Sequence, residues 1–126
     1  MNRVERLGSE RYVLLTTFRK DGRAVPTPVW VARDGAELVA WTVTTSGKAK
    51  RIRRSGEVTV APCDARGRAL GDAVAGRATI ADAAGTERIR RLLKQKYGLI
   101  GWITINGSRL RRGETGTVGI RIRIVD

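Results

Sequence analysis

The sequence contains no histidine, and only one of its 126 residues is a cysteine, Cys63. Without histidine the chain lacks the commonest general base and the commonest metal ligand of proteins, which excludes every His-dependent catalytic triad. A single cysteine forms no internal disulfide, and without histidine it cannot build a structural zinc site. We therefore expect no metal, and any chemistry at this protein depends on a reactive group that another molecule supplies.

Long apolar stretches are also missing. Runs such as Leu38–Trp41 are far shorter than the ~18 residues that a membrane span needs, so we expect no membrane segment. The first residues, Met1 to Glu5, lack the apolar stretch of a secretory signal peptide. Together with the single cysteine, which suits a reducing compartment, these features predict a cytoplasmic protein.

Acidic residues are scarce. Twelve Asp and Glu stand against 25 Lys and Arg, which gives a net charge of +13 in a single domain covering residues 1–126. A balance this basic favours an anionic partner, and a nucleic acid is one alternative. Aromatic residues make up only 5% of the chain, however, and the basic clusters lack the interleaved Phe or Tyr on which bases stack. We therefore expect a small anionic molecule rather than a nucleic acid.

Hydrophobic patterning indicates a mainly β, α+β chain that folds as a small antiparallel barrel with two or three short helices. The last strand, Val118–Ile124, alternates isoleucine with glycine and arginine, as a strand with one buried face does. Asp21-Gly22 and Asp34-Gly35 mark two turns between strands. The first nine residues suggest a short helical arm. Five further strands are expected at 12–17, 24–32, 37–43, 57–63 and 73–80.

Two prolines stand two residues apart in the second expected strand. Pro26 and Pro28 lack backbone N–H groups, and their spacing places both gaps on the same side of the strand. This side is expected to face a sheet edge or a ligand.

The segment 47–54, GKAKRIRR, has helical spacing but an unfavourable charge distribution. Ser46 is placed as its N-cap, yet Lys48 and Lys50 occupy the first turn, where the helix dipole favours acids. Ile52 is its one large apolar anchor. A helix start with its unpaired N–H groups, a hydroxyl and an ammonium together favour a bound phosphate. A solvated basic face is the alternative reading.

The second expected helix, 86–97, follows the electrostatic rules. Thr86 caps it, Glu87 lies in its first turn, and Gly98 follows its end. Its basic residues, Arg90, Lys94 and Lys96, are expected to be solvated. A second basic cluster, at Arg109, Arg111 and Arg112, is expected in a surface loop that could hold part of a ligand.

Residues 38–48, LVAWTVTTSGK, resemble a signature of the pyridoxamine-phosphate-oxidase-like flavin and deazaflavin proteins: an apolar strand ending in aromatic-Thr, a short turn, and Ser-x-Lys opening a helix. Residues 26–31, PTPVWV, are similar to the family's adjacent strand. The segments 60–64, 66–67 and 96–98 resemble the sequences of one branch of this family, which uses coenzyme F420, a deazaflavin. The likeness extends from about Arg11 to Val125.

This resemblance implies a split β-barrel that forms a homodimer, with cofactors in grooves between subunits and hydride transfer to a small electron-poor substrate. F420 carries a phosphodiester, a lactyl carboxylate and an oligoglutamate tail, so a chain of +13 suits it. Ser46 and Lys48 are assigned to the phosphate, and Lys50, Arg51 and Arg54 to the tail. The ring is expected beside Pro28, Val29, Trp30, Trp41 and Thr42, and Trp102 is expected to line a pocket wall.

Several alternatives stay open. The ligand of a split barrel could instead be flavin mononucleotide (FMN), haem or a bilin, held for storage rather than turnover. Trp30 and Trp41 could belong to the core. No catalytic residue is assigned, because Tyr97, Tyr12, a lysine and water are all candidate proton donors. Pyridoxamine phosphate oxidase activity is not expected, since the C-terminal extension of those enzymes has no counterpart here.

Overall fold

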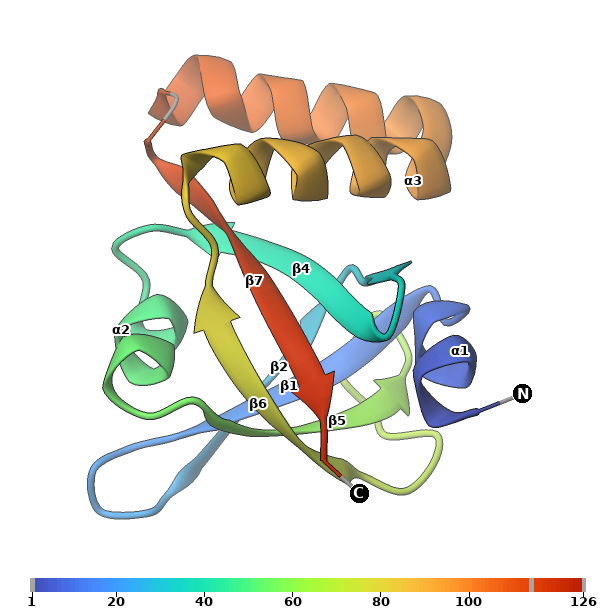
Figure 1. Ribbon diagram of the computed structural model, residues 1–126, viewed down its shortest axis with the longest axis vertical. Coiled ribbons are helices and arrows are strands. Elements are labelled where there is room, and N and C mark those ends of the chain that lie inside the picture. Colours follow the sequence, from blue (N-terminus) through green and yellow to red (C-terminus); the bar gives the residue numbers. More distant parts are fainter. Residues whose placement is uncertain (1, 114, 126) are drawn as a thin grey trace.

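A computed structural model of the protein describes residues 2–113 and 115–125 and shows a seven-stranded antiparallel sheet that curls into a split barrel (Figure 1). The strands lie in the order β2-β1-β5-β6-β7-β4-β3. This arrangement confirms the mainly β, α+β fold. The elements are α1 (Arg3–Gly8), β1 (Tyr12–Phe18), β2 (Ala24–Val29), β3 (Ala32–Asp34), β4 (Glu37–Val43), α2 (Gly47–Arg54), β5 (Glu57–Cys63), β6 (Val74–Ile80), α3 (Ala83–Arg112) and β7 (Thr117–Ile124).

The barrel interior is filled by the alternating apolar residues of the strands. Ile120 and Ile122 of β7 are fully buried, as are Val13 and Leu15 of β1 and Leu38 of β4. Alternation in β7 leaves Arg123 exposed. In β1 the period of two therefore decided which face is inside, whereas β4 is buried on both faces, between the barrel interior and α3.

The strand expected at 24–32 is divided in the structure into β2 and β3. At the break, the Val31 N–H donates to the Tyr97 hydroxyl at 2.9 Å, and the Val31 carbonyl accepts from the Lys96 ammonium at 2.6 Å. Side chains of α3 thus take the hydrogen bonds that a neighbouring strand would otherwise supply. This is why the sheet has seven strands rather than six.

Strand β2 lies at one edge of the sheet and pairs only with β1, in a register that sets Pro28 opposite Leu14. The expectation that Pro26 and Pro28 belong to an edge strand is confirmed. Since proline cannot donate to a ladder, the open side of β2 is poorly suited to a further strand and can border a ligand instead.

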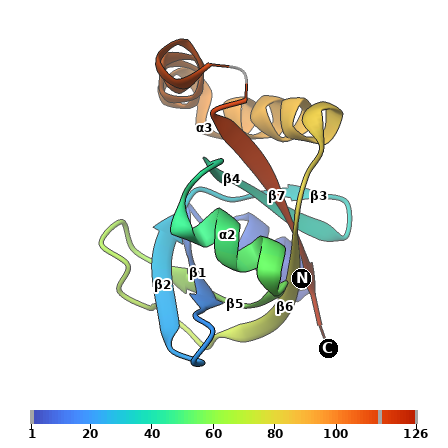
Figure 2. The same cartoon turned by 90° about the vertical axis from the view of Figure 1, so that its left-hand side faces the viewer.

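Helix α3 extends well beyond the range 86–97 that the sequence predicted. It begins after the N-cap Asp82, not Thr86, and it is interrupted at Gly98, whose φ of 62° and ψ of −140° are not helical. A positive φ of this kind is readily adopted by glycine. We call residues 83–97 the first half and residues 99–112 the second half. The two halves lie side by side above the barrel (Figures 1 and 2).

A second core cluster lies between α3 and the barrel. Ile89 and Leu93 of the first half and Ile105 of the second half are buried together with Val39 of β4. The contact with β7 is close, because a Cβ on Gly119 would lie 2.5 Å from Ile89 Cδ1. The two halves of α3 are therefore fixed to the sheet through one shared apolar layer.

None of the helices in the part of the chain that the structure describes is both long enough and apolar enough to span a membrane.

Candidate functional site

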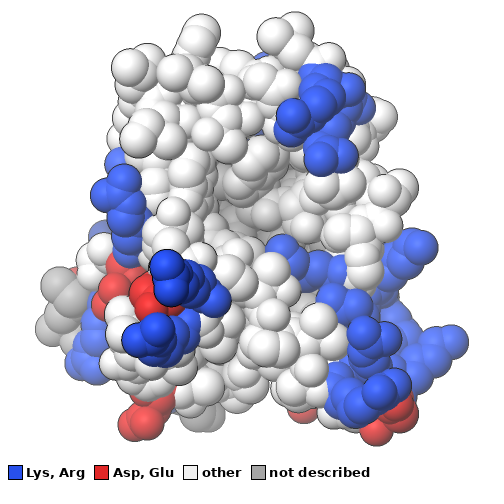
Figure 3. All heavy atoms as spheres, turned by 180° about the vertical axis from the view of Figure 1, so that it is seen from behind, with Lys and Arg blue, Asp and Glu red and all other residues white. Residues whose placement is uncertain are grey.

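A groove of about 320 Å³ lies between the barrel and the second half of α3. In the view from behind, a hollow separates α3 from the barrel, with Lys and Arg atoms at its margin (Figure 3). The red Asp and Glu atoms lie at the lower margins of this view, away from the hollow. The groove is lined by Pro28, Val29, Trp41, Thr42, Val43, Lys48, Thr104, Ser108, Arg111 and Arg112.

The start of α2 is fixed beside this groove by Ser46. The Ser46 hydroxyl accepts a hydrogen bond from the Ala49 N–H at 3.1 Å, which confirms that Ser46 is the N-cap. Its oxygen also lies 3.1 Å from the Thr42 hydroxyl at the end of β4. Because strand and helix are joined through these two hydroxyls, the helix N-terminus is held next to a residue of the groove wall.

Lys48 is the half-buried cation of the groove. Among the described residues, no hydrogen-bond acceptor and no carboxylate pairs with its ammonium. Burial, and then the nearby Arg51 guanidinium, lower the pKa of Lys48 below its ordinary value. A buried ammonium without an acceptor is unfavourable, so this position would be stabilised by an anion in the groove.

The opposite wall of the groove comes from the second half of α3. Arg111 and Arg112 are exposed there and form no hydrogen bond or ion pair within the described part of the chain. Thr104 and Ser108 lie on the same wall. The expectation that Arg109, Arg111 and Arg112 lie in a loop is wrong, because all three belong to α3. The spacing of Thr104, Ser108 and Arg111, four and then three residues, is the helical signal that could have revealed this wall.

A second basic cavity, of about 340 Å³, lies on the other side of the first turn of α2. Arg51 Nε donates to Thr17 Oγ1 and Arg54 Nη2 donates to the Phe18 carbonyl, both at 2.6 Å. These bonds hold two guanidinium groups beside the barrel without neutralising them. The lining residues are Arg19, Lys20, Gly47, Lys50, Arg51 and Arg54. Lys50, Arg51 and Arg54 were singled out from the sequence, whereas Arg19 and Lys20 were not.

The residues expected beside the ring are divided between the groove and the core. Pro28, Val29, Trp41 and Thr42 line the groove, and Trp41 also packs against the second core cluster. Trp30 instead stacks on Tyr97 in the second core cluster, with ring centroids 4.3 Å apart and an interplanar angle of 8°.

Trp102, expected on a pocket wall, lies outside the groove lining, and 56% of its surface is exposed. The reason is that residues 99–112 form a helix, which turns Trp102 away from the side that carries Thr104 and Ser108.

Two cations of α3 that were expected to be solvated are structural. Arg90 is only 3% exposed, and its Nη2 donates to Thr117 Oγ1 at 2.8 Å. The Lys96 ammonium donates to the Gly8, Glu10 and Val31 carbonyls, and its partial burial lowers the pKa of Lys96 to about 8. These contacts tie α3 to β7 and to the N-terminal arm.

Tyr97, one of the candidate proton donors, lies outside the groove lining. Its hydroxyl donates to the Arg11 carbonyl at 2.7 Å and accepts from the Val31 N–H. Burial raises the pKa of Tyr97 above its ordinary value. These bonds fix the start of β1 and the break between β2 and β3, so Tyr97 holds the fold rather than a ligand of the groove.

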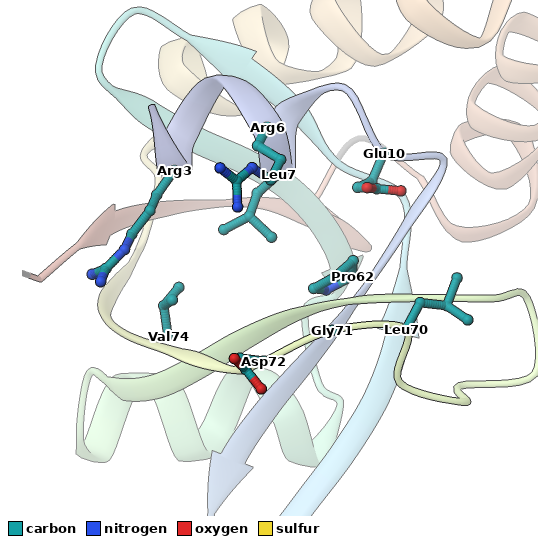
Figure 4. A pocket seen from close by; sticks show the side chains of 9 residues that line it. All are labelled: Arg3, Arg6, Leu7, Glu10, Pro62, Leu70, Gly71, Asp72 and Val74. Atoms are coloured by element: carbon teal, nitrogen blue, oxygen red, sulfur yellow. The ribbon is translucent and has the colours of Figure 1, made fainter. Parts of the chain in front are cut away.

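A cavity of about 470 Å³ between α1 and the segment that joins β5 to β6 is larger than the groove (Figure 4). Its charged residues, however, have both signs: Arg3 and Arg6 face the same space as Glu10 and Asp72. An anion is not preferred where carboxylates and guanidinium groups balance. The groove beside Lys48 is therefore the candidate site for an anionic ligand.

No group of acidic or cysteine side chains in the described residues is arranged to hold a metal ion. Cys63 is buried, and burial raises the pKa of its thiol. A thiol with a raised pKa is a poor nucleophile, so Cys63 is a structural residue of β5.

Comparisons with known proteins agree with this architecture. A family model described as pyridoxamine 5'-phosphate oxidase matches residues 3–125. Among solved structures, a protein described as an F420 reductase is 19% identical, with a TM-score of 0.65, over all of this chain and 96% of that one. A FAD-binding protein from Mesorhizobium loti is also 19% identical, with a TM-score of 0.61, over 100% of this chain and 91% of that one.

The haem storage protein HutZ from Vibrio cholerae is 12% identical, with a TM-score of 0.69, over 97% of this chain and 87% of that one. At these identities the likeness establishes the fold and leaves the ligand open. No curated protein matches the chain.

Proposed function

The chain belongs to the pyridoxamine 5'-phosphate oxidase family, and on this premise we propose that it is an oxidoreductase that binds coenzyme F420. The proposal places the deazaflavin ring in the groove, the phosphate at Lys48 and the start of α2, and the anionic tail over the second basic cavity. The observation that carries it is the half-buried Lys48 ammonium, which faces a groove without any carboxylate among the lining residues.

The residues of the groove fit a ring that carries a phosphate. Pro28, Val29 and Trp41 supply apolar surface, while Thr42 and Ser108 supply hydroxyl groups. Lys48 lies in the first turn of α2, where unpaired backbone N–H groups also favour an anion. A volume of about 320 Å³ lies within the usual range of small-molecule sites.

The second basic cavity favours an extended anion over a single phosphate. Gly47 lines this cavity and Lys48, the next residue, lines the groove, so the first turn of α2 separates the two spaces. A ligand with one phosphate needs only the groove. A ligand with further carboxylates can continue past α2 to Lys50, Arg51 and Arg54.

When bound, F420 supplies hydride transfer to an electron-poor substrate. The chain's own part is to orient the ring and to exclude water from one of its faces, through Pro28, Val29 and Trp41. Lys48 and Arg111 hold negative charge from opposite walls of the groove. The protic side chains of the lining, among them Lys48, Thr104 and Ser108, are the groups from which this chain could deliver a proton.

FMN is the second candidate. The groove by itself offers Lys48, Arg111 and Arg112, which together can balance one phosphate dianion. Storage of a cofactor, as in the haem storage protein of similar fold, would need no second basic cavity. The length of the bound anion therefore distinguishes these candidates.

A ligand panel tests the proposal. Apo protein is titrated with F420, FMN, FAD, haem and biliverdin, and binding is followed by fluorescence or absorbance. We expect F420 to bind with a Kd below about 10 μM, and FMN to bind more weakly. Absence of F420 binding at about 100 μM would overturn the proposal, and tighter binding of FMN would favour the second candidate.

A matched pair of variants locates the site. Lys48→Ala is expected to weaken F420 binding by about 1–3 kcal/mol, because a charge-assisted contact to phosphate is lost. Lys94→Ala is the control, since Lys94 is also half-buried but lies outside the linings of the groove and the second basic cavity. Equal weakening by both variants would mean that net charge, rather than this site, holds the ligand.

The salt dependence of binding distinguishes a nucleic-acid-binding function from a cofactor-binding one. An oligonucleotide held by the basic surface would show a steep fall of log K against log salt concentration. If the affinity for an oligonucleotide does not change with salt concentration while F420 binds in the groove, nucleic-acid binding is excluded as the function.

A further inference from the structure

Strand β1 places a hydroxyl group where its alternating pattern calls for an apolar side chain. Residues 13, 15 and 17 lie on the buried face of the strand, and the first two are Val13 and Leu15. The third is Thr17, which is only 1% exposed. Burying a hydroxyl is unfavourable unless it is hydrogen-bonded, and valine has nearly the same shape without this cost. The partner of the Thr17 hydroxyl therefore indicates why a threonine stands here.

The partner is Arg51 of α2, the helix that packs against β1 (Figure 2). Arg51 Nε donates to Thr17 Oγ1 at 2.6 Å. Because Nε belongs to the planar guanidinium, this bond fixes the direction of the whole group and uses only one of its five N–H donors. Within the described residues, neither Nη group of Arg51 has an acceptor and no carboxylate pairs with it. A neutral residue of the barrel thus orients the guanidinium without neutralising it.

The oriented guanidinium lies over Gly47, the first residue of α2. Arg51 comes four positions later, so its side chain runs back along the helix towards Gly47. A Cβ on Gly47 would lie 2.7 Å from Arg51 Nη1 and 3.5 Å from Arg51 Cζ. The φ of Gly47 is not positive, so glycine serves here to leave space rather than to allow an unusual backbone. A larger residue at this position would displace the guanidinium.

Arg51 also lies at the junction of the groove and the second basic cavity. It lines the second basic cavity, whereas Lys48, three residues earlier, lines the groove. Burial, and then the Arg51 guanidinium, lower the pKa of Lys48, which means that the two cations are close to each other. Like charges held at short range repel, and an anion between them relieves the repulsion. The place between Arg51 and Lys48 is therefore suited to a phosphate.

We propose that Thr17 is a positioning residue of the cofactor site: it fixes the Arg51 guanidinium in the space left by Gly47, where Arg51 and Lys48 together bind the phosphate. This inference rests on the proposed function for the presence of a phosphate beside Lys48. It assigns Arg51 to the phosphate rather than to the tail. Arg54, which also lines the second basic cavity, keeps its assignment to the tail.

Ligand pairs that differ by a phosphate test the role of Thr17. FMN and riboflavin are one pair, and F420 and its phosphate-free deazaflavin are the other. Thr17→Val is expected to weaken the binding of FMN and F420 about tenfold and to leave the two phosphate-free ligands unaffected. Thr17→Ser keeps the hydroxyl and should bind as the wild type does. If Thr17→Val leaves all affinities unchanged, or weakens all four ligands equally, the proposal is overturned.

Gly47→Ala tests the same geometry without a change in β1. The added methyl group meets only the end of a flexible side chain, so stability in urea should be retained while the affinity for FMN and F420 falls about tenfold. Gly107→Ala is the matched control, because Gly107 also lies in a helix but a Cβ there meets nothing within 4 Å. Its variant should keep the affinity of the wild type. Unchanged binding of FMN and F420 to Gly47→Ala would contradict the proposal.

The assignment of Arg51 to the phosphate is tested against Arg54. FMN carries the phosphate but no tail, so Arg51→Ala should weaken the binding of both FMN and F420. Arg54→Ala should weaken the binding of F420 alone. If Arg51→Ala weakens F420 but not FMN, Arg51 belongs to the tail and the inference is wrong.

This inference and the proposed function can fail separately. Equal F420 affinity of wild type and Thr17→Val overturns the inference and leaves the proposed function intact. If FMN binds and F420 does not, the proposed function fails, while FMN and riboflavin still test Thr17. If no cofactor binds, inorganic phosphate is the probe, and calorimetry at about 1–20 mM phosphate should show weaker binding to Thr17→Val than to the wild type. The same result for both proteins, including no binding, would overturn the inference.

Discussion

Two sets of cations in this protein have opposite surroundings. At the β3–β4 turn, the Arg88 guanidinium makes two hydrogen bonds of 2.9 Å to the Asp34 carboxylate. Arg121 of β7 contacts Asp34 at 3.1 Å and Glu37 at 3.2 Å. We call these four residues the paired cluster. It joins the first half of α3, β7 and the β3–β4 turn, and both of its positive charges have a partner.

The groove cations Lys48, Arg111 and Arg112 have none. No carboxylate among the described residues pairs with them. The net charge of +13 is therefore not spread uniformly over the surface. Arginines in the paired cluster hold the fold, while the cations of the groove leave an excess of positive charge directed at one space. Three experiments test this contrast between the two sets of cations.

The largest effect on stability is expected from Asp34→Asn. This change leaves Arg88 and Arg121 without their shared carboxylate, and the Asp34 side chain is only 15% exposed. We expect the free energy of unfolding in urea to fall by about 1–3 kcal/mol, with cofactor affinity unchanged.

The exposed pair of Asp21 and Arg23 is the control for this change, and Asp21→Asn should alter stability by less than about 0.5 kcal/mol. Equal effects of the two variants would contradict a structural role for the paired cluster.

Acid sensitivity is the next effect in size. Hydrogen bonding to Arg88, and then to Arg121, lowers the pKa of Asp34 from 3.8 to about 2. A carboxyl whose pKa is lower in the folded state contributes stability above pH 3.8, and this contribution is lost as the pH falls towards 2. We expect a loss of about 1–2 kcal/mol over this range in the wild type. The stability of Asp34→Asn should depend less on pH over this range than that of the wild type. Identical pH profiles of the two proteins would contradict the assignment of this acid sensitivity to Asp34.

The smallest change in the free energy of unfolding is expected for a variant in the groove, and this change has the opposite sign. Lys48→Met removes a half-buried ammonium that has no acceptor, so the apo protein should keep its stability or gain up to about 1 kcal/mol. Burial holds the pKa of Lys48 below its ordinary value of 10.5. The unfolded chain therefore binds the proton more tightly, and stability from this group rises as the pH approaches 10.5.

Urea unfolding at pH 7 and pH 10 measures this rise, which should be missing in the Met variant. A clear destabilisation by Lys48→Met at pH 7 would show that Lys48 has a partner in the fold, and the contrast between the two regions would then fail.

Much of the secondary structure followed from local patterns. The bounds of β4, β5 and α2 agree with the ranges 37–43, 57–63 and 47–54, because alternation, turn residues and the Ser46 cap are all local signals. The second half of α3 was missed, since Gly98, Gly101 and Gly107 interrupt a stretch without the usual polar outer side.

The candidate site was predictable only in part, because its two walls come from segments that are far apart in the chain. Thr42 and Lys48 lie within one short segment, so their proximity was readable from the chain. Arg111 and Arg112 are more than sixty positions away, and no local rule relates them to Lys48. The expectation that Arg90 is solvated was wrong, because its burial depends on a contact with Thr117 of β7, an element that is distant in the sequence.

The order of amino acids alone establishes that this chain has no histidine chemistry, that it is mostly β, and that a capped helix begins with lysines where acids are favoured. These properties depend on composition and on neighbours within a few residues. Which cations are neutralised and which face the groove depends on the three-dimensional fold, because the curled sheet and the folded-back α3 bring together residues that are far apart in the chain. The same folding left the apolar side chains of Leu99, Ile103 and Leu110 in α3 exposed to solvent.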